Sequence, residues 1–207
     1  MKGPSLTEKF TFVLVGRSGC GKGTQAQYIL KRLEREGVLH METGKFLREL
    51  LVSGNPTTDR AQQFIMEKGG LFPWWFPMFL WLRELIQHGH ADKHIVGDGT
   101  PRRVAEAKFL DDVMSWHDRP LPICIYVDVS RGEVMRRLLA RGRADDRRDV
   151  IRNRLNYFTR EVMPVIHYYA RRGRMIRVDG SLAPEEVFAQ IDRGLAEKVG
   201  TQWSRSA

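Results

Sequence analysis

The amino-acid sequence predicts an α/β fold with a central parallel sheet of about five strands and helices on both faces. Short apolar runs alternate along the chain with longer segments of helical spacing, which is typical of strand–helix–strand units. One apolar run is followed by Gly16, and two others end in Asp98 and Asp128. Because such sheets bind ligands beyond the carboxyl ends of their strands, we expect these three residues at the ligand-binding edge.

Four strands can be placed from their aliphatic and β-branched residues. The segment 24–36 has apolar residues at helical spacing and stops at Gly37. We predict strands at 10–15, 95–98, 123–128 and 175–178, and helices at 24–36, 44–53, 57–69, 74–88, 104–117, 131–141 and 147–171, with a last helix opened by Pro184. The sequence has no internal repeat or long linker, so we expect a single domain over residues 1–207.

The composition excludes several classes of protein. No stretch reaches the roughly 18 apolar residues that a membrane span needs, and the first nine residues lack the apolar core of a signal peptide, so we expect a cytoplasmic location. The two cysteines, Cys20 and Cys124, lie far apart. They offer neither a disulfide framework nor a paired-cysteine zinc site.

The net charge of +9 comes from one part of the chain. Residues 131–177 contain fourteen arginines, no lysine and five acidic residues, so the remainder is neutral. Arginine is the residue that binds phosphate oxygens in a bidentate manner. The stretch therefore favours a small polyanionic ligand, and a nucleic-acid partner stays open as the alternative.

A glycine-rich loop follows the first predicted strand and opens the next helix. Gly16 to Lys22 fits the pattern G-x-x-x-x-G-K in the strand–loop–helix context that the motif requires. Its backbone N–H groups and the start of the helix attract phosphate, and Lys22 reaches the outer phosphates. The Ser/Thr that usually follows the lysine is replaced by Gly23, and the hydroxyl comes at Thr24. We interpret Cys20 as a small space-filling residue, because nothing adjacent supplies a base.

With Gln25-Ala26-Gln27 appended, this loop resembles the opening of adenylate kinases and related nucleoside-monophosphate kinases. The resemblance continues in order along nearly the whole chain. Residues 42–48 are similar to the acceptor-site segment of that family, and residues 98–102 (Asp-Gly-Thr-Pro-Arg) are similar to its Asp-Gly-Phe-Pro-Arg. Residues 141–146 and 152–155 are similar to its lid and to the start of the next helix, and residues 165–169 match a common family sequence. Five motifs in the same order are far more specific than any one of them.

The resemblance implies a three-layer P-loop kinase fold with a very short lid. It implies reversible transfer of the γ-phosphoryl group of ATP to a nucleoside monophosphate, with AMP as the default acceptor and Mg²⁺ as cofactor. The acceptor-binding helical segment would lie at about 43–90 and the minimal lid at about 141–147. We expect a monomer whose partners are small nucleotides, with no membrane partner and no zinc. Such chemistry needs positioning and positive charge, and no general base.

Carried over residue by residue, the family's roles form three groups. ATP would be bound by Gly16, Ser18, Gly19, Cys20, Gly21, Lys22, Gly23, Thr24, Arg137 and Arg141. The monophosphate would be bound by Thr43, Gly44, Arg48, Gly99, Arg102, Glu106, Arg143 and Arg154. Lys22, Arg102, Arg141, Arg143 and Arg154 would act in catalysis, and Asp98 would hold Mg²⁺ through water.

Three departures from the family pattern bear on the site. The lid between Arg141 and Arg143 is almost absent, and Lys45 replaces a usual aspartate. Glu106 stands where the family typically has a glutamine that reads the adenine of AMP. Because a carboxylate only accepts hydrogen bonds, it suits the N–H donors of guanine better than the ring nitrogen of adenine, unless Glu106 turns outward or is protonated. GMP or CMP thus stays open as the acceptor.

Two further alternatives concern function and the acceptor pocket. A non-catalytic nucleotide- or nucleic-acid-binding regulatory module is the alternative of a different class. An aromatic run at 71–81 falls where the family wraps the acceptor base, although core packing also explains such a run. Trp74 and Trp75 cannot both face inward on one helix, so we expect at least one of them near the acceptor site.

Overall fold

The computed structural model describes residues 8–51, 54–63, 71–88, 92–143, 146–200 and 203. The strands are β1 (Thr11–Val15), β2 (Val38–Glu42), β3 (His94–Asp98), β4 (Ile123–Asp128) and β5 (Met175–Asp179). The helices are α1 (Lys22–Arg32), α2 (Thr43–Leu51), α3 (Pro56–Gln62), α4 (Trp75–His88), α5 (Val104–Trp116), α6 (Arg131–Arg141), α7 (Arg148–Tyr157), α8 (Met163–Ala170) and α9 (Pro184–Val199), with short turns η1 (Glu34–Glu36) and η3 (Phe158–Val162).

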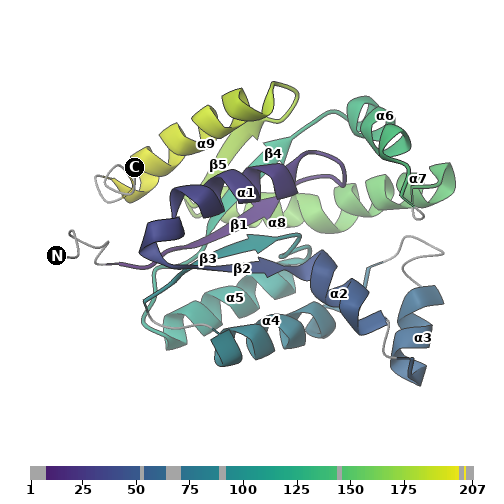
Figure 1. Ribbon diagram of the computed structural model, residues 1–207, viewed down its shortest axis with the longest axis horizontal. Coiled ribbons are helices and arrows are strands. Elements are labelled where there is room, and N and C mark those ends of the chain that lie inside the picture. The colour runs from purple at the N-terminus through teal and green to yellow at the C-terminus, as the bar shows by residue number, and fades with distance from the viewer. Residues whose placement is uncertain are drawn as a thin grey trace.

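The strands form one parallel sheet in the order β2-β3-β1-β4-β5. Helices α1 and α9 cover one face, and α4, α5 and α8 cover the other, so the predicted three-layer α/β fold is confirmed (Figure 1). Sequence patterning did not locate β2. This edge strand is mostly half-buried, so it lacks the continuous apolar run that marks a central parallel strand.

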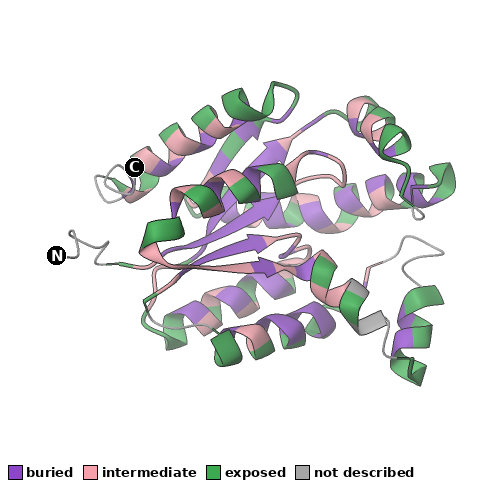
Figure 2. Cartoon of the chain, viewed as in Figure 1, coloured by how far each residue is buried: buried purple, intermediate pink, exposed green. Residues whose placement is uncertain are grey.

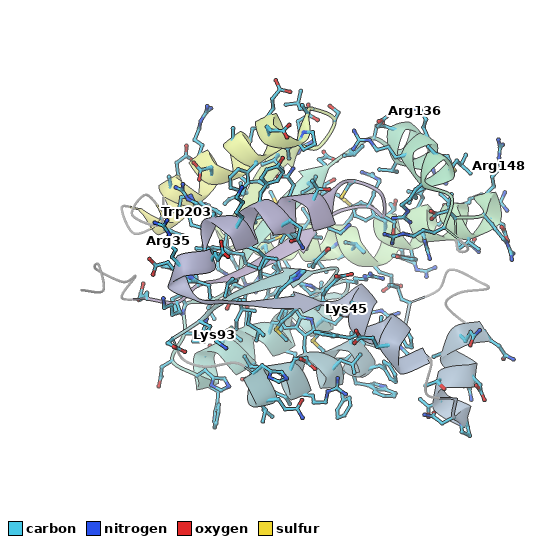
Figure 3. All side chains as sticks on the ribbon, viewed as in Figure 1. Arg35, Lys45, Lys93, Arg136, Arg148 and Trp203 are labelled. Atoms are coloured by element: carbon cyan, nitrogen blue, oxygen red, sulfur yellow. The ribbon has the colours of Figure 1, made fainter. Side chains whose placement is uncertain are left out.

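The two faces of the sheet carry separate hydrophobic cores. In β1, Phe12 and Leu14 pack with α1 and α9, whereas Val13 and Val15 pack with α4, α5 and α8, because successive side chains of a strand point to opposite faces. The central strands β1, β3 and β4 are accordingly buried along most of their length, the edge strands β2 and β5 less so, and the helices carry exposed residues on their outer sides (Figure 2). Trp203 packs against the first core beside α1 (Figure 3). Its indole lies edge-on to the Phe12 ring, with 5.7 Å between the ring centroids.

Helical segments on both sides of the carboxyl edge frame the region where the strands end. Figure 1 shows α2 and α3 on one side of that edge, and α6 with the start of α7 on the other. The helix predicted at 147–171 is continuous from α7 to α8, with a π-helical turn at η3. The helix predicted at 57–69 ends at Gln62 as α3, and residues 64–70 lie outside the described residues. Among the described helices, none combines the length and apolarity needed to cross a membrane.

The close approach of α4 to β3 gives a test of core packing. A Cβ on Gly97 would lie 2.5 Å from the indole of Trp81, so Gly97→Ala should displace Trp81 and lower the free energy of unfolding by about 1–3 kcal/mol in urea titrations. The control is Gly132→Ala in α6, where nothing lies within 4 Å of the added methyl. That variant should be as stable as the parent or slightly more so, since alanine favours helix. Equal stability of both variants would contradict this packing.

A buried histidine at the opposite edge of the sheet predicts acid sensitivity. His94 is fully buried against Phe10 and Phe12, and its Nδ1 accepts from the Phe10 N–H at 3.1 Å. Burial, with the charges of Lys9 and Arg119, lowers the pKa of His94 from 6.5 to about 3.

In the pH range between these two values the unfolded chain binds a proton that the folded chain excludes. Above pH 6.5, His94 should therefore not lower the free energy of unfolding, because it is neutral in both states. Below that pH the free energy of unfolding should fall by up to about 1.4 kcal/mol per pH unit. Urea titrations across this range should show a shallower slope for His94→Asn, whereas replacing the exposed His117 should leave the slope intact. An unchanged slope in His94→Asn would refute the assignment.

Candidate active site

The glycine-rich loop joins β1 to α1, and within it the Cys20 N–H donates to the Arg17 carbonyl at 3.2 Å. Gly19 and Gly21 have φ values of 83° and 96°, a left-handed region that favours glycine. Gly21 begins α1 with no side chain capping the helix, so the first helical N–H groups are available to a ligand. A Cβ on Gly19 would come within 2.8 Å of the Leu138 side chain, so this glycine also lets α6 approach the loop.

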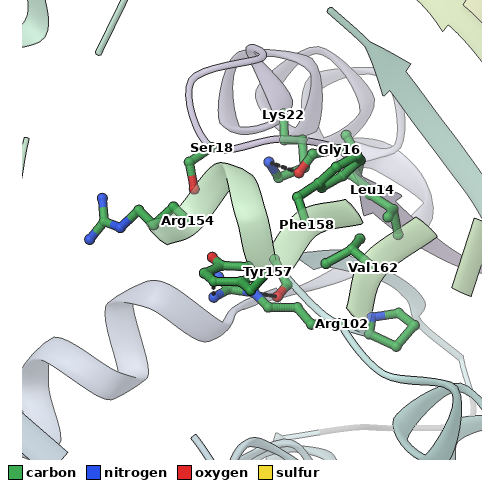
Figure 4. A pocket seen from close by; sticks show the side chains of 12 residues that line it. Leu14, Gly16, Ser18, Lys22, Arg102, Arg154, Tyr157, Phe158 and Val162 are labelled. Carbon is green, nitrogen blue, oxygen red and sulfur yellow. Dashed lines mark hydrogen bonds between the residues drawn. The ribbon is translucent and has the colours of Figure 1, made fainter. Parts of the chain in front are cut away.

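Lys22 is folded across this loop. Its ammonium donates to the main-chain oxygen of Gly16 (Figure 4) and to that of Arg17, both at 2.9 Å. It also lies 3.6 Å from the Sγ of Cys20, which is 1% exposed. Cys20 therefore fills space beneath the loop, as the sequence suggested.

One pocket brings together predicted residues from three separate parts of the chain. Figure 4 shows it between the glycine-rich loop, the loop after β3, and the junction of α7 with η3. The lining residues are Leu14, Val15, Gly16, Ser18, Lys22, Gly99, Pro101, Arg102, Arg154, Tyr157, Phe158 and Val162. Three cationic residues thus line one pocket at the carboxyl edge of the sheet, where positive charge suits a polyanion, although the Arg154 guanidinium points outward in Figure 4.

Arg102 is oriented by two side-chain contacts. Its Nε donates to the Gly99 carbonyl at 2.7 Å, and one terminal nitrogen lies 3.5 Å from the Tyr157 hydroxyl. A guanidinium has five N–H donors. These two contacts use two of them, so three N–H donors on the terminal nitrogens stay available. Arg102 can therefore receive a phosphate group without breaking the contacts that orient it.

The arginines of the predicted lid gather on Asp146, a residue of the lid motif for which the sequence predicted no role. Arg141 binds its carboxylate in a bidentate manner at 2.8 and 2.9 Å, and Arg154 lies 3.7 Å away. The Arg143 main-chain N–H also donates to it at 3.1 Å. Although burial alone would raise the pKa of Asp146, hydrogen bonds from Arg141 and from the Arg143 main chain hold it below its ordinary value. The remainder of the lid, residues 144 and 145, lies outside the described residues.

On the acceptor side, Thr43 opens α2 and is tied into the core. Its hydroxyl donates to that of Thr100 at 2.8 Å and accepts from the Trp81 indole at 3.1 Å, and the residue is 2% exposed. What Thr43 and Gly44 offer to an anion is therefore the main-chain N–H groups at the helix start. Arg48 belongs to α2, but its side chain lies outside the described residues.

The aromatic run contacts a predicted site residue through a different tryptophan from the expected pair. Trp74 and Trp75 are 42% and 54% exposed, and Trp81 is the one whose side chain reaches Thr43. In α4 the buried positions are Phe76, Leu80 and Trp81 among others. Helical phase therefore turns Trp75 to the surface.

Lys45, one of the departures from the family pattern, lies on α2 at the surface. It forms an exposed ion pair with Glu49 at 3.9 Å.

Glu106 is directed toward the main chain that precedes its own helix. Its Oε2 accepts from the Arg102 N–H at 2.6 Å, and the residue is 2% exposed. Burial raises the pKa of this carboxyl, and the hydrogen bond and charge of Arg102 act against that rise. The pocket of Figure 4 is lined without it.

The remaining predicted residues flank the pocket. Arg137 of α6 donates to Glu133 at 2.6 Å and to the Gly180 carbonyl at 2.9 Å, which links α6 to the loop after β5. Asp98 ends β3 close to the start of α1, with its Oδ2 3.4 Å from where a Cβ on Gly23 would stand. No hydrogen bond or ion pair engages the Asp98 side chain within the part of the chain that the structure describes.

Arg17 is a second residue that sequence reasoning missed. Its guanidinium donates to the Val129 carbonyl at 2.9 Å, pairs with Asp128 at 3.4 Å and lies 4.5 Å from the centre of the Phe158 ring. It therefore fastens the glycine-rich loop to β4 and to η3. The only sequence signal for the role of Arg17 was its charge within the loop motif. The signal for Asp146 was clearer, because it is an acidic residue among closely spaced arginines.

Comparisons with known proteins agree with these motifs. The family model described as adenylate kinase matches residues 14–174. An adenylate kinase of Thermus thermophilus is 36% identical over 187 residues, which cover 88% of this chain and 95% of the relative. Adenylate kinases of a Synechococcus species and of Xanthomonas euvesicatoria are 35% and 34% identical, over 89% and 88% of this chain and 97% of each relative.

The Asp146 cluster predicts a large difference between two neighbouring carboxylates. The Asp146 side chain is 1% exposed, so Asp146→Ala leaves Arg141 and Arg154 without their shared anion. It should lower the free energy of unfolding in urea by about 2–3 kcal/mol, toward the low end for buried pairs because Arg141 is partly exposed. The matched control is Asp149→Ala, which removes an exposed pair with Arg147 and should have little effect. Similar losses in both variants would contradict the anchoring role of Asp146.

Proposed function

The chain belongs to the adenylate kinase family, and on this premise we propose that its site transfers the γ-phosphoryl group of ATP reversibly to AMP, giving two molecules of ADP. The observation that carries the proposal is that Lys22, Arg102 and Arg154 line one pocket beside the glycine-rich loop. Two nucleotides bring two sets of phosphates to that pocket. Three cations from separate elements suit such a double anion.

We assign the donor nucleotide to the loop and to α6. The N–H groups from Gly16 to Thr24 would surround its β- and γ-phosphates, and Lys22 would exchange its two carbonyl contacts for phosphate oxygens. Arg137 would lie over the donor base, since it already bridges α6 and the loop that begins at Gly180. These contacts fix the donor in one orientation, which in-line transfer requires.

We assign the acceptor monophosphate to Arg102 and to the start of α2. Arg102 would bind its phosphate with the N–H groups that Gly99 and Tyr157 leave available, and Thr43 and Gly44 would contribute main-chain N–H groups. Arg48 would add a further cation from α2. The acceptor phosphate is already ionised near neutral pH, so the attack needs no protein base.

Arg141, Arg143 and Arg154 would stabilise the charge on the phosphoryl group in transit. They come from two helices and the short segment between them, and Asp146 holds two of these guanidinium groups in advance. Preorganised positive charge acts most strongly where water is excluded. A small movement of α6 and α7 toward the pocket would bring these groups onto the phosphates.

Asp98 suits a magnesium ion bound through water. It is a carboxylate beside the phosphate loop with no partner among the described residues, and Mg²⁺ is generally held by one or two carboxylates together with phosphate oxygens and waters. When bound, the ion would neutralise phosphate charge during transfer. A monomeric state and a cytoplasmic location, both expected from the sequence, stay predictions.

The alternatives are weaker. GMP or CMP as the acceptor rested on Glu106 alone, and the relatives described above are named adenylate kinases. A non-catalytic nucleotide-binding module would need the phosphate loop but no Arg102 beside it. Arg136 and Arg148, which a nucleic acid would contact more readily, lie on the outer sides of α6 and α7, away from the pocket (Figure 3).

A coupled assay of ATP against AMP, GMP, CMP and UMP tests the proposal. We expect AMP to be the preferred acceptor, and Lys22→Met to lower turnover by at least about a hundredfold, because it removes a charge that stabilises the transferring group. Lys31→Met, which changes an exposed lysine of the same helix, should retain parental turnover. Binding of ATP without transfer to any monophosphate would overturn the proposed function.

A further inference from the structure

The third residue of α5 holds a buried carboxylate whose contacts are local. The residue before α5, Arg103, provides no side-chain cap to the helix, because a guanidinium cannot accept a hydrogen bond. Glu106 supplies the acceptor instead, with its Oε2 2.6 Å from the Arg102 nitrogen. A carboxylate near a helix N-terminus is also stabilised by the helix dipole.

Burial limits what else this carboxylate can do. Glu106 is 2% exposed, and a buried charge is expensive unless it is paired and hydrogen-bonded. The main-chain N–H and the charge of Arg102, together with those of Arg103, provide that compensation. To contact this carboxylate, a nucleobase would have to reach a side chain that is almost fully buried.

The same contact fixes the main chain of a residue that we assigned to the acceptor phosphate. Arg102 is anchored at its backbone by Glu106 and at its side chain by the Gly99 carbonyl at 2.7 Å and by Tyr157. The two anchors act on opposite ends of one residue. Together they define where its guanidinium meets the pocket of Figure 4.

We propose that Glu106 is a positioning residue for Arg102, so that it acts on the phosphate of the acceptor and not on its base. The inference rests on the proposed function, in that Arg102 must bind the acceptor phosphate. It replaces the hypothesis that Glu106 selects guanine. Discrimination among bases then depends on groups other than this side chain.

The test compares two ligands that share a base, AMP and adenosine, of which only AMP has a phosphate. For Glu106→Ala we expect the KM for AMP to rise about tenfold, the scale of one lost hydrogen bond to a charged group, with the KM for ATP unchanged. The inhibition constant of adenosine, competing with AMP, should not move. Glu106→Gln retains an oxygen that can accept from the Arg102 N–H, so it should restore the KM for AMP to within about threefold of the parent.

The control is Asp111→Asn in the same helix. Asp111 lies in the middle of α5 and pairs with Arg174, so this variant perturbs the helix without touching Arg102. Its melting temperature should fall while the KM for AMP stays at the parental value. A rise in that KM equal to the rise in Glu106→Ala would assign the effect to general destabilisation and overturn the inference.

Other outcomes are equally decisive. If Glu106→Ala weakens AMP and adenosine by the same factor, Glu106 reads the base. If it weakens neither, the contact with Arg102 does not govern acceptor binding, and the inference is wrong. Failure of the parent enzyme to phosphorylate AMP would instead refute the proposed function, so the two failures are distinguishable.

Discussion

The whole site depends on one constraint, that parallel strands end at a common edge. Leu14 is in register with Asp98 of β3, and Val15 with Tyr126 of β4, so the chain leaves three adjacent strands at nearly the same level. The glycine-rich loop and the loop after β3 are therefore neighbours although some eighty residues separate them. No local interaction could assemble Gly16 and Gly99 in one pocket; the order and direction of the strands do so.

Such an edge concentrates positive charge, and the structure offsets that charge with carboxylates. Asp146 holds Arg141, Asp128 holds Arg17 and Arg177, and Glu133 holds Arg137. Each pair keeps a guanidinium oriented and limits repulsion among the arginines. Because Arg141 is only partly buried, the exchange of its contact with Asp146 for the proposed contact with phosphate would have a moderate cost. Two acidic residues of the arginine-rich stretch, Glu133 and Asp146, thus help to orient the arginines that flank the candidate site.

The sequence was sufficient where a residue's environment is set by its neighbours in the chain. Central strands are apolar on both faces, and the phosphate loop is a continuous segment, so both could be predicted. The edge strand β2, the π-helical turn at η3 and the anchor Asp146 could not, since each depends on contacts between distant segments. Trp81 belongs to this group too: its indole bonds to Thr43 only because Gly97 allows α4 to approach β3.

Glu106 shows why a position within a motif does not by itself transmit a role. A carboxylate at the third position of a helix lies beside main-chain N–H groups that are already in place. A contact with these groups does not cost the translational and rotational entropy that binding a ligand costs. A glutamine at the same position offers its oxygen to the same N–H groups, but it also has two donors for a base. Replacing glutamine by glutamate removes those donors and adds a charge that burial penalises. The local hydrogen bond then becomes the most favourable use of the side chain, and the fixed position of Arg102 follows from it.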